Sequence, residues 1–218
     1  MRYYGESPKC LGEVRVDCPE MLFYQYLPIK MAGDSGVYER AIERRLQFLT
    51  PFLGKVLCDY VAEYNLESLR DNYVYLTIKK MYQMPGCSFN REGWHSDGFM
   101  TNDVNYIWSD RFPTVFNTTK FELSPDDRLS LHEMTAQANP RFDTWYPNCY
   151  LLRLDQYNIH RVKEIDNPAM RTFIKVSFSR DKYDLLGNSH NYQLDYDWEM
   201  KKRGEARNIP QTTINNAN

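Results

Sequence analysis

The chain has 218 residues, and its 27 Lys and Arg nearly balance its 29 Asp and Glu, for a net charge of −2 at pH 7. This length fits one domain with a substantial core. The near-neutral charge gives no electrostatic reason to expect a nucleic acid or a membrane surface as partner.

Neither the cysteines nor the N-terminus indicates export. The five cysteines are odd in number and none has C-x-x-C spacing, which argues against both a disulfide framework and a zinc knuckle. The first residues contain no apolar signal-peptide core, and no apolar run approaches the ~18 residues of a membrane span. We expect a soluble, cytoplasmic protein without a transmembrane segment.

The first part of the chain, residues 1–71, is expected to form an irregular and helical support layer. Residues 1–33 contain three prolines among short apolar pieces. In residues 34–66, apolar side chains recur near helical spacing, and Pro51 is expected to kink or divide this helix.

From residue 72 to about residue 180, short segments rich in aromatic and β-branched residues predominate, which predicts a β core. The expected strands are 73–82, 103–108, 113–116, 149–162 and 171–179, and residues 117–148 are expected to be turns and polar stretches. Residues 181–218 form a polar tail whose end, 211–218, is expected to be mobile. Helices followed by many short strands predict a single domain over residues 1–218, mainly β, of the sandwich or jelly-roll class.

A His-x-Asp pair in the β region is the first indication of chemistry. His95 and Asp97 stand between two glycines, Gly93 and Gly98, which permit a bend or a close approach of the backbone. In a strand, residues two apart point to the same side, so both side chains can face one metal. Chance alone would supply roughly 0.3 such pairs in a chain of this composition, so the motif needs support from elsewhere.

His160 lies in the expected strand 149–162, on the face opposite the charged residues Arg153 and Asp155. We therefore expect His160 to point inward, as a metal ligand or as a core histidine bonded to a neighbour. The next strand carries Arg171, whose guanidinium is a planar fork of donors that matches a carboxylate.

The combination of His95-x-Asp97, His160 and Arg171 resembles the Fe(II)/2-oxoglutarate-dependent dioxygenase superfamily over about residues 72–180. Two imidazoles and one carboxylate form the facial triad of non-haem Fe(II) oxygenases. The resemblance implies the double-stranded β-helix, a cupin-like jelly roll. It also implies iron bound by His95, Asp97 and His160, with Arg171 holding the distal carboxylate of 2-oxoglutarate. The implied reaction uses O2, releases succinate and CO2, and hydroxylates a C–H bond.

Other residues are expected near the co-substrate. Phe173 stands where some members of the superfamily have Ser, and Ser177 and Lys175 lie on the same face of the strand as Arg171. Either could help to bind 2-oxoglutarate. Because Lys175 is also a cation, the sequence does not decide whether Arg171 alone binds the carboxylate. Tyr82, Tyr106 and Trp108 are candidate wall residues, although each is individually more typical of a core.

Four functions are compatible with the sequence. The first is oxidation of a small molecule or a protein side chain, and the second is the same chemistry on a nucleic-acid base, which the charge does not favour. The third is a non-catalytic β-sandwich binding module, and the fourth, a zinc hydrolase, lacks an evident general base. The remaining histidines, His132 and His190, are expected on the surface. No motif specifies the primary substrate or the oligomeric state.

Overall fold

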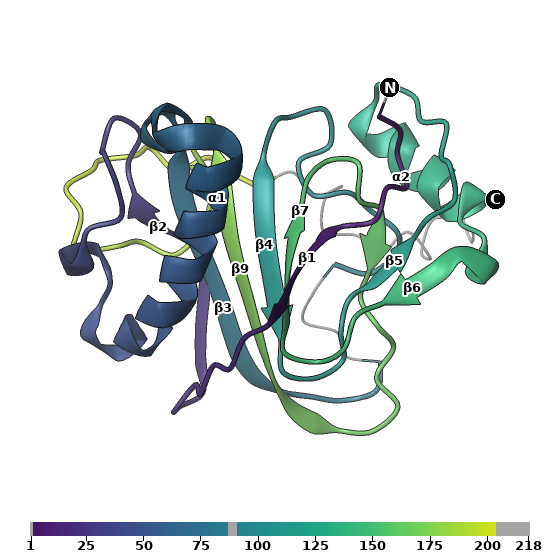
Figure 1. The fold of residues 1–218 in the computed structure, drawn as a ribbon, viewed down its shortest axis with the longest axis horizontal. Helices are drawn as coiled ribbons and strands as arrows, with labels where there is room; N and C mark the ends of the chain where they lie inside the picture. Colours follow the sequence, from purple (N-terminus) through teal and green to yellow (C-terminus); the bar gives the residue numbers. More distant parts are fainter. Residues whose placement is uncertain (1, 87–90, 204–218) are drawn as a thin grey trace.

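The computed structural model describes residues 2–86 and 91–203 and is built mainly from antiparallel strands (Figure 1). The strands are Lys9–Glu13 (β1), Leu22–Lys30 (β2), Tyr73–Gln83 (β3), Val104–Ser109 (β4), Val115–Asn117 (β5), Asp143–Trp145 (β6), Tyr150–Leu154 (β7), His160–Arg161 (β8) and Ala169–Ser179 (β9). The helices are α1 (Thr50–Asp71), α2 (Asp127–Gln137) and three short 3₁₀ segments, Glu39–Ala41, Arg44–Leu49 and Pro140–Phe142.

The strands form two antiparallel sheets. The larger, which we call the major sheet, has the order β1-β7-β4-β9-β3-β2, and the minor sheet has the order β6-β5-β8. Helix α1 lies across the outer face of the major sheet (Figure 1). This arrangement confirms the mainly β, jelly-roll fold class with supporting N-terminal helices.

Alternate residues of β9 face two different environments, as the sequence predicts. Ile174, Val176 and Phe178 enter the main hydrophobic core with residues of α1. The ring of Tyr60 in α1 stacks on Phe178 with 3.8 Å between ring centroids. The intervening residues, from Arg171 onward, face the minor sheet, so burial under the helix fixes which side chains are left for the interior cavity.

The N-terminal region contains strands where the sequence predicted irregular chain. Segment β2 is rich in aromatic and apolar residues, and it pairs with β3 at one edge of the major sheet. Its proline, Pro28, is compatible with a strand because an edge strand has one side without ladder bonds. Pro28 therefore lies within an edge strand, whereas Pro8 and Pro19 lie in loops.

Pro51 was expected to kink or divide the helical stretch, and the structure shows a division without a kink: the 3₁₀ segment Arg44–Leu49 ends where α1 begins. Helix α1 begins at Thr50, so the proline lies in the first turn, where its missing N–H removes no helical hydrogen bond. The departure from helical geometry is at Asn65, with φ 75° and ψ 171°. Upstream of Thr50, the expected helix is present only as short 3₁₀ segments.

The expected strand 149–162 is divided by a turn. After β7, the backbone N–H of Asp155 donates to Asn158 Oδ1 and that of Tyr157 donates to Asp155 Oδ1, two local bonds that bend the chain. The chain thereby passes from the major sheet to the minor sheet, where His160 begins β8. Helix α2 was also missed in the sequence, although Asp126 caps it by accepting from two backbone N–H groups.

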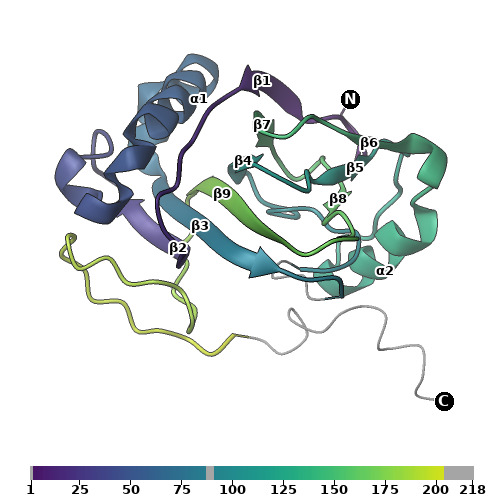
Figure 2. The same ribbon diagram turned by 90° about the horizontal axis from the view of Figure 1, so that it is seen from below.

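The chain after β9 runs back beside β2 (Figure 2). The N–H of Ser189 donates to Gln25 O, and the Asn191 side chain donates to the carbonyls of Pro28 and Ala41. The predicted mobile end, 211–218, lies outside the described residues. Within residues 2–86 and 91–203, none of the helices combines the length and apolar character needed to cross a membrane.

Candidate metal and co-substrate site

The side chains of His95, Asp97 and His160 converge between the two sheets. Each offers one ligand atom, and the three atoms lie within 4.8 Å of one another. The Nε2 atom of His160 lies 3.6 Å from Asp97 Oδ2, and both histidines are buried. Two imidazoles and a carboxylate at this spacing are a donor set suited to a divalent metal such as Fe(II).

A backbone bridge places the two histidines side by side. The N–H of each donates to the carbonyl of the other at 2.9 Å, which adds His95 to the minor sheet beside β8. Beyond this bridge His95 and Asp97 do not lie in a strand, because the chain enters a turn at Asp97. Gly98 makes this turn with φ 70°, and a Cβ there would lie 2.7 Å from Thr101 Oγ1 and 2.8 Å from Asp103 Cβ.

The hydrogen bonds of the two imidazole rings engage Nδ1 and leave Nε2 of each ring for a metal. Nδ1 of His95 lies 2.9 Å from Gly93 O, and Nδ1 of His160 lies 2.9 Å from Asn158 O. A carbonyl only accepts, so each Nδ1 carries the proton and each Nε2 keeps its lone pair. Burial and the neighbouring His160 lower the pKa of His95 to about 3, so this ring is neutral at pH 7.

Lys175 reaches the same cluster from β9. Its Nζ lies 2.7 Å from Asp97 Oδ2. Burial by itself would raise the pKa of Asp97, but Lys175 and then the two histidines hold it well below its usual range. The carboxylate is therefore ionised, as a metal ligand must be.

Arg171 is buried on the same strand and presents a donor without a partner. Its Nε donates to Arg111 O at 2.8 Å and its Nη2 to Phe112 O at 3.1 Å. The third nitrogen, Nη1, is buried and makes no hydrogen bond. Burial lowers the pKa of Arg171 to about 10, an effect that Asp110 partly offsets. A buried guanidinium with an unused donor fits a carboxylate ligand.

A cavity of about 710 Å³ connects these groups. Its lining includes His95, Asp97, His160, Arg171 and Lys175, together with Thr77 and Lys79 of β3 and Tyr183 and Asp184 after β9. This volume lies within the roughly 300–1,000 Å³ of small-molecule sites. All three candidate ligands and the two candidate cations thus open into one space.

The remaining predicted residues lie elsewhere. Ser177 donates to Asn105 Oδ1 at 2.6 Å and is not part of the cavity lining. Tyr82 is 52% exposed, because only the odd-numbered side chains of this part of β3 face the cavity. Tyr106 and Trp108 belong to the core under α1. These findings give no support to Ser177 or Tyr82 as co-substrate contacts.

The rival histidines do not join the cluster. His132 is exposed on α2, and His190 is exposed in the segment after β9, where its ring contacts Tyr192 and Tyr196. The expectation that both lie on the surface is confirmed. The candidate ligand set within the described ranges is therefore the predicted one.

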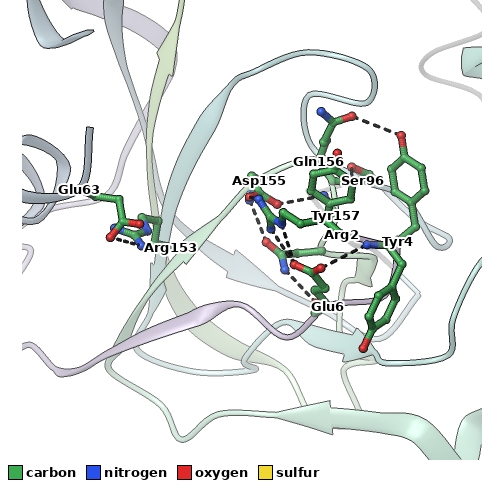
Figure 3. A network of polar contacts seen from close by, with 11 residues as sticks. Arg2, Tyr4, Glu6, Glu63, Ser96, Arg153, Asp155, Gln156 and Tyr157 are labelled. Carbon is green, nitrogen blue, oxygen red and sulfur yellow. Dashed lines mark hydrogen bonds and ion pairs between the residues drawn. The ribbon is translucent and has the colours of Figure 1, made fainter. Parts of the chain in front are cut away.

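A network missed in the sequence holds the two ligand-bearing segments together (Figure 3). The backbone carbonyl of Gln156 accepts from Ser96 Oγ at 2.6 Å, and its side-chain Oε1 accepts from Met100 N at 3.1 Å and Tyr4 Oη at 3.2 Å. Gln156 thus connects the turn before His160 to the chain on both sides of Asp97.

The N-terminal segment supports this turn from outside. Arg2 pairs with Asp155 at 2.6 Å and with Glu6 at 2.8 Å (Figure 3). Asn158 Nδ2 donates to the carbonyl of Glu6. Arg2 and Asp155, like Glu6 and Asn158, lie about 150 positions apart in sequence, so no local pattern indicates these two contacts. Only the turn residues Asp155 and Asn158 gave a signal that the chain bends here.

Comparison with known proteins gives little further information. No family model and no curated protein matches the chain. A crystal structure of EvdO2 from Micromonospora carbonacea var. aurantiaca is similar at 14% identity and TM-score 0.40, over 61% of this chain and 62% of that one. The same protein complexed with 2-oxoglutarate aligns at 14% identity and TM-score 0.35, over 69% and 71%. In the first of these the chain spans less than two thirds of the length of its neighbour.

Proposed function

We propose that this chain is an Fe(II)- and 2-oxoglutarate-dependent dioxygenase that hydroxylates a C–H bond of a small molecule or a protein side chain. One observation carries the proposal: a His-Asp-His donor set and a buried arginine with an unused donor open into the same cavity. Bound Fe(II) would supply the oxidising chemistry with O2, and 2-oxoglutarate would leave as succinate and CO2.

The donor set fits the metal. Nε2 of His95 and of His160 and the carboxylate of Asp97 would hold Fe(II), and the bound metal would supply the chemistry of oxidation by O2. The bonds from Nδ1 to backbone carbonyls hold both rings in the orientation and tautomer that binding requires.

The two cations have different roles in this account. Lys175 is paired with Asp97, so it stabilises the ionised ligand and keeps the carboxylate oriented. Arg171 keeps a free Nη1, so it is the cation available for the distal carboxylate of 2-oxoglutarate. Because Arg171 is buried, a charge-assisted bond there is less screened by water than one at the surface.

The test is a titration without oxygen of the metal-free chain with Fe(II) and then 2-oxoglutarate, followed by admission of air. We expect a weak visible charge-transfer band on adding the 2-oxo acid, and slow release of succinate in air. No band from folded, iron-loaded protein would refute the proposal and favour a binding module. Salt-sensitive retention of DNA or RNA would instead favour the same chemistry on a nucleic-acid base.

A further inference from the structure

One buried carboxylate in the cavity has no cation beside it. Asp103 is 7% exposed and lines the cavity directly before β4. Within residues 2–86 and 91–203, its carboxylate makes one hydrogen bond, in which Oδ2 accepts from Tyr183 Oη at 2.8 Å. No Lys, Arg or His in these ranges forms an ion pair with it. Charged side chains are seldom buried unless they are paired, because an isolated charge loses its solvation.

The hydroxyl of Tyr183 does not balance this charge. Burial, and then the charge of Asp103, raise the pKa of Tyr183 well above its usual range, so the hydroxyl stays protonated and donates as a neutral group. The residue is also fixed by Tyr75, because the two rings stack with 4.2 Å between centroids and Tyr183 N donates to Tyr75 Oη at 3.0 Å. Tyr183 therefore orients the carboxylate of Asp103 and leaves its negative charge in place.

Asp103 lies beside the segment that carries a candidate metal ligand. A Cβ at Gly98, the residue after Asp97, would lie 2.8 Å from Asp103 Cβ and 3.4 Å from its Oδ2. Thr101 connects the two residues, because its Oγ1 donates to Gly98 O and accepts from Asp103 N. The carboxylate is thus held close to the metal site without being part of the donor set.

Asp103 and Arg171 lie at opposite ends of the cavity face of the major sheet. The residue after Asp103 is opposite Phe178 of β9, and the strand from Arg171 to Phe178 spans roughly 23 Å at about 3.3 Å per residue. Lys175, which pairs with Asp97, lies between these ends. A 2-oxoglutarate held between the metal and Arg171 would therefore leave the part of the cavity in front of Asp103 for the substrate.

Resting on the proposed function, we propose that the primary substrate is a small molecule with an ammonium or guanidinium group, and that Asp103 binds this group. A cationic nitrogen would donate to the carboxylate and supply the positive charge that is missing at ion-pair distance among the described residues. A neutral hydroxyl could donate as well, but it would leave the charge unbalanced. The contact would orient the substrate with another part toward the metal, in a cavity whose volume of about 710 Å³ has room beside the co-substrate.

The experiment uses the full chain loaded with Fe(II) without oxygen, at about pH 7, where an alkylamine is protonated. Calorimetry first measures binding of 2-oxoglutarate. The saturated protein is then titrated with benzylamine, with benzylguanidine and with the neutral benzyl alcohol. Asp103→Asn removes the charge but can still accept from Tyr183, Tyr183→Phe removes that donor but keeps the charge, and Asp17→Asn removes an exposed charge before β2 as the matched control.

We expect one equivalent of benzylamine or of benzylguanidine to bind to the 2-oxoglutarate complex more tightly than benzyl alcohol, and the tighter of the two identifies the cationic group. Asp103→Asn should weaken this binding about ten-fold or more, because the negative partner of a charge-assisted bond is lost. Tyr183→Phe and Asp17→Asn should retain it. Asp103→Asn should not lower the urea midpoint of the ligand-free protein, because it removes a buried charge that has no counterion.

The order of titrations separates the two claims. No response to 2-oxoglutarate refutes the proposed function and the inference with it. After a normal response to 2-oxoglutarate, the inference alone is refuted if neither cation binds, if benzyl alcohol binds as tightly as they do, or if Asp103→Asn binds them as the native chain does. Loss of binding with a lower urea midpoint in Asp103→Asn, or an equal loss in Tyr183→Phe, would assign Asp103 to the support of the fold and would also overturn the inference.

Discussion

Arg171→Met should separate the function of this residue from its effect on stability. Because burial lowers its pKa to about 10, keeping Arg171 charged in the folded protein costs about 3 kcal/mol. The variant removes that cost but also removes the donors to Arg111 O and Phe112 O, a loss of about 1–3 kcal/mol for each buried carbonyl. The two effects oppose one another, so the free energy of unfolding of the metal-free chain should change by no more than about 3 kcal/mol.

The affinity for 2-oxoglutarate should fall whatever the change in stability. A charge-assisted contact to a carboxylate contributes about 1.5–3 kcal/mol, which corresponds to a dissociation constant roughly 10- to 150-fold larger in the variant. Urea denaturation gives the first quantity, and titration of the iron-loaded protein gives the second. Arg180→Met, which removes an exposed charge just after β9, should alter neither. Unchanged co-substrate affinity in Arg171→Met would refute this reasoning and transfer the role to Lys175.

Three further substitutions test separate parts of the structure. Asp97→Ala should abolish iron binding, and it should destabilise the metal-free chain by about 3–5 kcal/mol because Lys175 is left buried without its carboxylate. Adding Lys175→Met should recover most of this stability but no iron binding. Urea denaturation measures the stability, and iron titration measures the binding. Gln156→Leu should weaken iron binding roughly 10- to 100-fold, because it removes the side-chain acceptor of Met100 N and Tyr4 Oη. Gln137→Leu, which cuts a similar network away from the cavity, should not, and equal effects would contradict a positioning role. Phe178→Ala should lower the free energy of unfolding by about 3–5 kcal/mol and leave iron affinity nearly unchanged, because this side chain faces α1. A large loss of iron affinity would contradict the separation of the two faces of β9.

The parts of the fold that follow from local alternation could be predicted from the sequence. Strand β9 alternates apolar residues with Arg171, Phe173 and Lys175, and this pattern alone assigned one face to a core and the other to a site. The inward direction of His160 was also correct, because its neighbours alternate in the same way.

The reasoning behind His160 was nevertheless incomplete. Arg153 marked the supposed solvent face of a long strand, yet its guanidinium pairs with Asp59 and Glu63 of α1 and is largely buried. The charged face was the helix-covered face, and the strand ended at the turn beginning with Asp155. The inward direction of His160 was still correct because the inner side chains of both strands lie between the two sheets. Leu152 and Leu154 of β7 pack with Phe116, and the ring of Phe116 also contacts that of His160.

The contacts that assemble the site depend on partners far apart in sequence. The bridge between His95 and His160 joins two segments of chain, and Gln156 and Tyr4 interact across 152 positions. No periodicity or turn signal encodes such pairs, since they arise from tertiary packing. The pairing of Lys175 with Asp97, rather than with a co-substrate, belongs to the same class.

The most direct test of the account is a crystal structure of the full chain grown without oxygen in the presence of Fe(II) and 2-oxoglutarate. We expect one metal ion bound by Nε2 of His95, Nε2 of His160 and the carboxylate of Asp97, with the distal carboxylate of 2-oxoglutarate on Arg171 Nη1. A metal bound by other residues, or a 2-oxoglutarate whose distal carboxylate lies on Lys175 while Arg171 keeps only its backbone partners, would contradict it.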